Sequence, residues 1–167
     1  SACGEEALQT LPLVEQIFIN AADGMDEIAF ERHLYIVRRR TEKAIEANDD
    51  YFYVPSLSSK VISYKGLVMP HNLPAFYRDL SDDRLESSLC VFHQRFSTNT
   101  WPEWRLSQPF RYLAHNGEIN TVMGNRNWMR AREALMASPE LGGDLEQVFP
   151  ICTPGASDSA TFDEALE

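Results

Sequence analysis

Two apolar runs that each end in polar side chains constrain the fold and function of this chain most. Residues 89–92 read Leu-Cys-Val-Phe and lead into His93, Gln94 and Arg95, and residues 110–114 lead into a His-Asn-Gly triplet at 115–117. Short apolar runs bounded by turn residues favour β-strands. Strands that end in polar side chains beside a loop, here a Trp- and Pro-rich one, commonly build a binding cleft. We therefore expect a cleft within residues 90–127.

The remaining chain supplies further elements around this stretch. Apolar or alternating patterns predict strands at residues 14–19, 51–54 and 60–64, and helical spacing predicts helices at residues 26–47 and 119–137 and from residue 157 onward. Two short helical turns are expected between residues 72 and 86. With this many strands, the chain is predicted to be one α+β domain spanning residues 1–167.

The helix predicted over residues 26–47 has a clear start and a clear face. Asp26 suits the N-cap, and Arg38 and Glu42 are spaced as an i,i+4 ion pair. The residues predicted to share the packed face are Phe30, Leu34, Val37, Thr41 and Ile45. Runs of like charge are usually solvated, so the arginines at 38–40 are interpreted as a solvated face in preference to an anion site.

The charge balance excludes several classes of partner. Asp and Glu outnumber Lys and Arg by 25 to 15, which gives a formal net charge of -10. Such a surface repels phosphate backbones and anionic lipid, so we expect neither nucleic-acid nor membrane-surface binding. No apolar run reaches the ~18 residues that a membrane span needs, and the N-terminus lacks the layout of a signal peptide.

The cysteines and histidines are too few and too scattered for a structural metal site. Cys3, Cys90 and Cys152 form no CxxC pair, and the four histidines have no metal-ligand spacing. We therefore predict no disulfide framework and no metal, and a reducing, cytoplasmic location.

Three positions carry the polar chemistry of a binding site, each with a plainer interpretation beside it. Arg95 suits bidentate capture of a carboxylate, or a surface ion pair. Asn116 and Gly117 suit an oxyanion hole, because glycine lets its backbone N–H approach a reacting atom closely, or a hairpin turn. Asp158 suits a substrate ammonium, or a helix N-cap. Trp101 and Trp104 would either close over a ligand or anchor their loop to the core.

Taken together, these motifs resemble one family. The combination of HQRFST, AHNGEIN and SDS is similar to the class II glutamine amidotransferases, which are N-terminal-nucleophile hydrolases. The intervening TWPEWRLSQPFRYLAHNGEINTVMGNRNWMRAR resembles the branch found in the large subunits of glutamate synthases. The VEQIFI, GMDEIAFERHLYIVRR and YVPSLSSKVISYKGLV segments extend the resemblance over essentially the whole chain. The fold that it implies is a four-layer αββα sandwich, incomplete at both ends.

The resemblance also implies a role for each candidate residue. Arg95 would bind the α-carboxylate of glutamine with help from Thr98, and Asp158 would bind the α-ammonium. Asn116 and Gly117 would stabilise the tetrahedral oxyanion. Residues 96–105 would form a lid over the substrate.

The start of the chain departs from the family pattern. The family's nucleophile is an N-terminal cysteine whose own α-amine acts as the base, and such an amine has a pKa near ~7.7–8.0. Here Cys3 follows Ser1 and Ala2, and no strand pattern comes after it. We therefore expect an interior piece of a larger polypeptide, with the nucleophile outside these residues.

The resemblance extends to substrate, cofactors and partners. It implies hydrolysis of L-glutamine to glutamate and ammonia, and ammonia transfer to 2-oxoglutarate in another domain of the large subunit. FMN and an iron–sulfur cluster would be bound by other domains and no cofactor by this chain, and a small electron-transferring subunit or ferredoxin would be a partner. Two alternatives remain: a non-catalytic glutamine-binding module, and a class II amidotransferase that supplies another acceptor.

Overall fold

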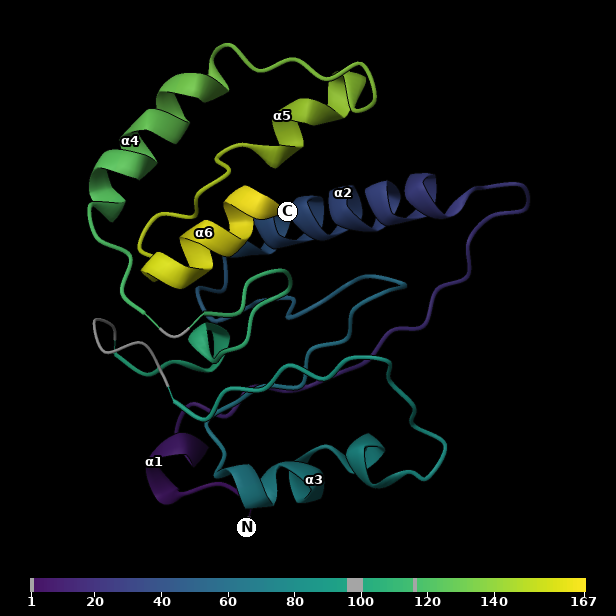
Figure 1. Ribbon diagram of the computed structural model, residues 1–167, viewed down its shortest axis with the longest axis vertical. Coiled ribbons are helices and arrows are strands. Elements are labelled where there is room, and N and C mark those ends of the chain that lie inside the picture. The colour runs from purple at the N-terminus through teal and green to yellow at the C-terminus, as the bar shows by residue number, and fades with distance from the viewer. Residues whose placement is uncertain (1, 96–100, 116) are drawn as a thin grey trace.

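The computed structural model describes residues 2–95, 101–115 and 117–167. Six α-helices occur within these ranges: α1 (Glu5–Leu8), α2 (Glu27–Glu46), α3 (Leu73–Phe76), α4 (Val122–Glu133), α5 (Leu145–Val148) and α6 (Asp158–Leu166). Four short 3-10 helices accompany them: η1 (Pro70–Asn72), η2 (Arg78–Ser81), η3 (Trp104–Leu106) and η4 (Gly142–Asp144). Extended segments and turns join these elements (Figure 1).

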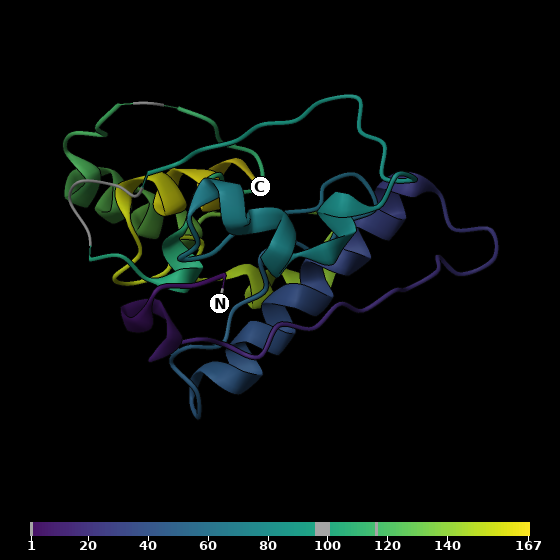
Figure 2. The same ribbon diagram turned by 90° about the horizontal axis from the view of Figure 1, so that it is seen from below.

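Helix α2 is the longest element and the others are arranged around it. Its N-cap is the predicted one, because the Asp26 carboxylate accepts a hydrogen bond from the Ala29 N–H at 2.8 Å. Helix α5 lies beside α2 (Figure 2) and on the same side as α4, away from α1 and α3 (Figure 1). The end of α6 reaches α2 through the Arg38–Glu167 ion pair. The Lys43 ammonium ties α2 to α5 by donating to the Glu146 carbonyl at 2.9 Å.

The expected αββα sandwich is wrong. Across the described ranges there is no strand, and residues 14–19, 51–54, 60–64, 89–92 and 110–114 are extended or irregular. A strand needs a second backbone to pair with. Between described residues, every backbone hydrogen bond outside the helices joins positions four or fewer apart, so no ladder forms. In residues 14–19 the apolar side chains stay in solvent, with Ile17 76% and Phe18 90% exposed.

The buried interior is unusually polar. Six apolar side chains are buried among the described residues: Leu34, Ile36, Trp104, Leu106, Val148 and Ala160. Nine buried residues are polar or charged: Arg38, Arg39, Lys65, Ser107, Ser157, Asp158, Ser159, Thr161 and Asp163. Because buried charges are costly unless they are paired, the charged side chains of this interior need partners close by.

Two predictions about α2 need correction. Arg38 and Arg39 are only 3% and 8% exposed, so the interpretation of residues 38–40 as a solvated face is wrong for these two side chains. Carboxylates and carbonyls from distant segments surround them and make burial tolerable. Val37 was predicted to pack and is 47% exposed, because the buried face of α2 is rotated toward these arginines.

Candidate active site

Helix α6 begins with a capped turn and supplies the predicted acidic residue. The Ser157 hydroxyl accepts a hydrogen bond from the Ala160 N–H at 3.1 Å, so Ser157 is the N-cap and Asp158 is the first helical residue. The plainer interpretation of Asp158 as the N-cap is therefore wrong. Because Asp158 does not cap the helix, its carboxylate can contact other segments.

Asp158 is buried and bonded through both of its oxygens. Oδ1 accepts the Ser159 N–H at 2.7 Å and the Ser159 hydroxyl at 3.2 Å, and Oδ2 accepts the Ile119 N–H at 3.1 Å. Burial by itself would raise the pKa of this carboxyl. The hydrogen bonds from Ile119 and Ser159, helped by nearby His115, outweigh burial and hold the pKa below its usual value. Asp158 is therefore a carboxylate at neutral pH.

The start of α6 also holds the segment that contains the predicted oxyanion residues. The His115 Nε2 atom lies 2.8 Å from the Ser159 hydroxyl, and the Ile119 N–H donates to Asp158. Gly117 lies between these two anchors and is exposed. A Cβ atom added to Gly117 would meet only the His115 ring, at 3.9 Å, which is ordinary contact. Gly117 is thus exposed, two residues before the Ile119 N–H that contacts Asp158.

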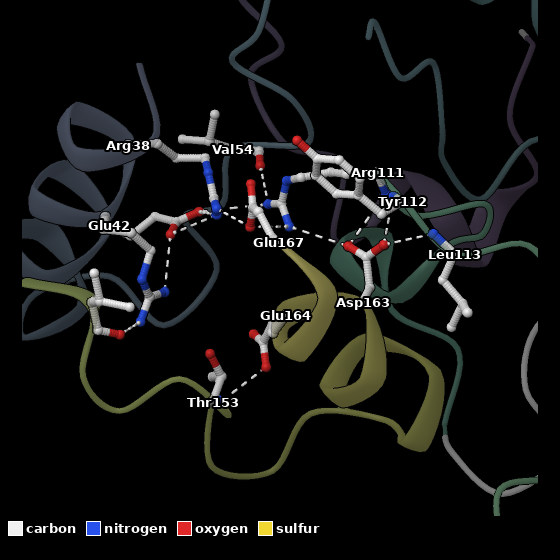
Figure 3. A network of polar contacts seen from close by, with 12 residues as sticks. Arg38, Glu42, Val54, Arg111, Tyr112, Leu113, Thr153, Asp163, Glu164 and Glu167 are labelled. Carbon is white, nitrogen blue, oxygen red and sulfur yellow. Dashed lines mark hydrogen bonds and ion pairs between the residues drawn. The ribbon is translucent and has the colours of Figure 1, made fainter. Parts of the chain in front are cut away.

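Asp163 anchors the run that leads to this segment. Its side chain is completely buried, and its oxygens accept backbone N–H groups from Arg111 at 3.2 Å, Tyr112 at 2.7 Å and Leu113 at 2.9 Å (Figure 3). A carboxylate that accepts three successive N–H groups fixes the direction of that backbone. Residues 111–119 are therefore attached to α6 at two points, Asp163 and the pair Asp158–Ser159.

The Arg111 side chain extends the network from α6 to α2. Its guanidinium lies 3.6 Å from Asp163, 3.8 Å from Glu167 and 3.9 Å from Glu42, and it donates to the Val54 carbonyl at 2.8 Å (Figure 3). Its buried Nε has no hydrogen-bond partner. This guanidinium joins Asp163 and Glu167 at α6 to Glu42 of α2, which lies far from them in the sequence.

Arg38 and Arg39 complete the network on the α2 side. Both pair with Glu42, at 3.1 and 3.3 Å, and the first also pairs with Glu167 at the end of α6. The second donates to the Val148 and Pro150 carbonyls at 3.2 and 2.8 Å. The arginines of α2 are structural cations that hold α6 and the residues after α5 in place.

Glu164 lies beside this network and behaves differently from Asp158. It accepts the Thr153 N–H at 2.9 Å (Figure 3). Burial raises its pKa, and the Thr153 hydrogen bonds and the charges of Arg39 and Arg111 offset that rise only in part.

The two loop tryptophans have opposite surroundings. Trp101 is 85% exposed, whereas Trp104 is 5% exposed and packs its ring 5.7 Å from that of Phe76. Trp104 therefore anchors η3 to the core, and Trp101 projects into solvent.

The structure brings together only some of the predicted site residues. Gly117 and Asp158 lie on adjoining segments through the Ile119 contact. Arg95 is exposed, and within the described ranges no hydrogen bond or ion pair joins it to Asp158. Thr98 and Asn116, and residues 96–100 of the predicted lid, lie outside the described residues.

Several residues of the site were not predicted. His115 lies within the AHNGEIN motif and Ser159 within the SDS motif. No other feature of the sequence pointed to these two residues. Arg111 and Asp163 are separated by 52 positions in the sequence. Nothing local in the sequence indicates that they meet.

No disulfide joins the three cysteines. Cys90 is exposed and Cys152 is half-buried. Burial, with Glu164 and Glu133 nearby, raises the pKa of the Cys152 thiol. Cys3 follows Ala2, whose carbonyl accepts the Asn72 amide at 3.1 Å, so it lies beside the η1 segment.

Metal ligands and membrane spans were sought in the same ranges. No group of three or more His, Cys, Asp or Glu side chains in the described part of the chain is arranged to hold a metal ion. No described helix is both long enough and apolar enough to cross a membrane.

Comparison with known families identifies the chain. The family model for class II glutamine amidotransferases matches residues 1–167. The chain belongs to this family. The match includes the anchored segment 111–119 and α6.

Individual relatives agree with this family. The chain is 48% identical over 165 residues to the glutamate synthase [NADPH] large chain of Azospirillum brasilense, and 46% identical over 165 residues to that of Bacillus subtilis. It is 45% identical over 171 residues to the chloroplastic ferredoxin-dependent glutamate synthase 2 of Arabidopsis thaliana. These matches cover 98%, 98% and 100% of this chain. They cover 11%, 11% and 10% of the relatives, so the chain spans about a tenth of their length.

Proposed function

We propose that residues 1–167 form part of the glutamine-hydrolysing domain of a glutamate synthase, which releases ammonia from L-glutamine. The single observation that carries this proposal is the attachment of residues 115–119 to the start of α6 by two hydrogen bonds. This attachment joins the segment that contains the exposed Gly117 to Asp158, whose pKa is held below its usual value. A zwitterionic amide substrate needs an anion for its ammonium and N–H donors for its developing oxyanion.

The substrate-binding roles follow from charge. Asp158 binds the α-ammonium of glutamine through the lone pairs that its present donors leave unused. Arg95, with Thr98, binds the α-carboxylate, because an exposed guanidinium offers a bidentate fork to an incoming ligand. Contacts at both ends of the amino acid would fix the position of the side-chain amide of glutamine.

The reaction is acyl transfer to a thiol. A cysteine sulfur attacks the side-chain carbonyl carbon of glutamine, and the oxygen becomes an oxyanion held by Gly117 N–H and the Asn116 side chain. Collapse of this intermediate breaks the C–N bond and releases ammonia, and water then hydrolyses the thioester to glutamate. We assign the nucleophile to an N-terminal cysteine of the full-length polypeptide, as family resemblance implies, and not to Cys152, whose raised pKa disfavours the thiolate.

The parent enzyme supplies the remaining chemistry. We propose that the ammonia reaches 2-oxoglutarate in another domain, and that FMN and an iron–sulfur cluster are held there. The described residues do not fit a cluster site, because their cysteines are dispersed and no ligand group forms among them. The electron donor is a partner outside this chain, either a nicotinamide-dependent small subunit or ferredoxin. Three cysteines without a disulfide between them suit a reducing cytoplasmic location.

Substrate recognition by Asp158 is tested with a matched pair of amides. Ammonia release from L-glutamine and from glutaramate, which lacks the α-amino group, is measured for the full-length product of the gene. The wild-type enzyme should prefer glutamine, and Asp158→Asn should lose about 10- to 100-fold of that preference, the value of a hydrogen bond to a charged group. The exposed Asp83→Asn variant is the control and should keep the preference.

The comparison separates recognition from structural damage. Asp158→Asn also weakens the Ile119 contact, and that damage lowers activity on both amides equally. An unchanged ratio between glutamine and glutaramate would therefore disprove the ammonium-binding role. Glutamine binding without ammonia release by the wild-type enzyme would favour the non-catalytic binding module instead.

A further inference from the structure

Helix α4 follows directly after the segment that carries Gly117, although nothing in the proposed reaction uses it. The helix lies at one edge of the molecule (Figures 1 and 2). Every residue of α4 is described, and none of them is buried. Four residues at helical spacing are half-buried and form its inner face: Val122, Arg126, Met129 and Glu133. The two polar side chains of this face, Arg126 and Glu133, both contact residues that follow α5.

The Arg126 guanidinium binds the start of α6. It donates to the Thr161 hydroxyl, at 3.1 Å from Nε and 2.7 Å from Nη2. Nη2 also donates to the carbonyls of Ala156 and Ser157, the latter at 3.3 Å. Two of these acceptors precede Asp158 and one follows it. A single planar guanidinium therefore holds the chain on both sides of the candidate ammonium-binding residue.

The backbone that leads into α4 is attached to the same place. The Ile119 N–H donates to Asp158 at 3.1 Å, and α4 begins three residues later. Thr121, between them, has a φ of 59°, in the left-handed region that β-branched residues rarely adopt. Such a conformation persists only where the surrounding contacts enforce it. The Ile119 and Arg126 contacts lie on either side of this turn, and both end at the start of α6.

We propose that Arg126 is a positioning residue, which holds α4 against the start of α6 and thereby fixes the direction of the Asp158 carboxylate. The direction of a side chain at the first position of a helix depends on the backbone just before it, and Arg126 binds two carbonyls of that backbone. The Ser157 hydroxyl fixes the same turn from within α6, because it accepts the Ala160 N–H at 3.1 Å.

The consequence for the reaction rests on the proposed function. With Asp158 binding the α-ammonium of glutamine, loss of Arg126 weakens recognition of the amino group. It does not weaken recognition of an amide that lacks this group. A displacement of about 1 Å in a binding group can cost about 100-fold in rate. Arg126 therefore contributes to the selection of an amino acid over a simple amide.

The preference for L-glutamine over glutaramate tests this role. The preference is the ratio of the two kcat/KM values, measured on the full-length product of the gene. We expect Arg126→Met to reduce it about 10-fold, because Asp158 is displaced and not removed. Arg132→Met, at an exposed position of the same helix, is the matched control and should leave the ratio within about twofold of the wild type.

The ratio separates positioning from general damage. Damage lowers both kcat/KM values together, and an unchanged ratio in Arg126→Met would disprove the positioning role. In the Asp158→Asn background, adding Arg126→Met should change the ratio by less than about twofold, because Arg126 then has no carboxylate to position. A further loss of about 10-fold in the double variant would show that the two residues act independently, and would also disprove it.

Hydrogen exchange of the same full-length protein gives a readout that does not depend on activity. Peptides covering residues 117–121 and 156–161 should exchange about 10-fold faster in Arg126→Met, the value of a hydrogen bond to a charged group. Peptides from the middle of α2 should exchange as in the wild type, and an equal rise there would exclude a local role. Thr161→Val removes one acceptor of the same guanidinium, and it should show the same changes more weakly even if Arg126→Met fails to fold.

The positioning role and the proposed function fail separately. If exchange rises as expected while the wild-type protein releases no ammonia from glutamine, the proposed function has failed and the positioning role stands. If the wild-type protein releases ammonia but exchange is unchanged in both Arg126→Met and Thr161→Val, the positioning role has failed and the proposed function stands.

Discussion

Replacing Asp163 by asparagine removes one charge from the most buried side chain of the site. In Asp163→Asn, the amide oxygen still accepts from Tyr112 and Leu113, at 2.7 and 2.9 Å in the present structure. The amide NH2 then faces the Arg111 N–H, now 3.2 Å from the carboxylate, and the Arg111 guanidinium at 3.6 Å. The asparagine NH2 is itself a donor, so it cannot accept from the Arg111 N–H groups as the Asp163 carboxylate does.

The size of the effect follows from these contacts. A buried N–H left unpaired costs about 1–3 kcal/mol. Breaking a buried ion pair costs roughly 3–5 kcal/mol, but Glu42 and Glu167 remain within 3.9 Å of Arg111 and reduce that cost. We expect Asp163→Asn to lower the free energy of unfolding by about 3 kcal/mol, and Asp163→Ala to lower it further because three N–H groups lose their acceptor.

Urea unfolding followed by circular dichroism measures this loss. With a slope of about 2 kcal/mol per molar urea, the midpoint should fall by about 1.5 M. Asp83→Asn, at an exposed position, should change the free energy of unfolding by less than about 0.5 kcal/mol. A loss below about 1 kcal/mol for Asp163→Asn would show that the three N–H contacts do not hold residues 111–113.

Two further substitutions, Gly66→Ala and Glu164→Gln, test the packing and the charges around the same interior, and Gly124→Ala serves as a comparison for the first. Gly66→Ala places a Cβ 2.5 Å from the Trp104 ring, and we expect overpacking to cost about 1–3 kcal/mol in urea unfolding; Gly124→Ala in α4 meets open space and should instead stabilise by about 0.5–1 kcal/mol. Glu164 has a raised pKa in the folded chain, so its stabilising contribution is complete below its unfolded pKa and is lost as pH rises through the folded value. Glu164→Gln should therefore show a smaller fall in stability than the wild type between pH 4.5 and 7.5, and equal falls would contradict burial as the cause.

Local signals in the sequence predicted local structure well. The Asp26 cap and the helical spacing after it located α2, and the start of α6 was placed within one residue. These elements depend on neighbours three or four positions away, which the sequence shows directly. The Arg38–Glu42 pair was predicted for the same reason and is confirmed.

Contacts between distant segments could not be predicted in this way. Residues 89–92 and 110–114 have the pattern of strands, but a strand forms only where it pairs with another segment. In the described part of the chain neither segment is paired. Arg38 is buried because Glu167, 129 positions later, meets it. The family and Asp158 could be inferred from motifs, whereas the carboxylate that anchors the approach to the site, Asp163, could not.

The double attachment of residues 111–119 to α6 sets a limit on chain length. Asp158 and Asp163 are five residues apart on one helix, a rise of about 7.5 Å, and they hold Ile119 and Leu113 respectively. Because α6 is a regular helix, the distance between these two attachment points is fixed, and the backbone from Leu113 to Ile119 must span it. Inserting or deleting one residue there would leave both attachments intact while shifting the Gly117 N–H out of place. Length in this interval is therefore as much a part of the site as the identity of its side chains.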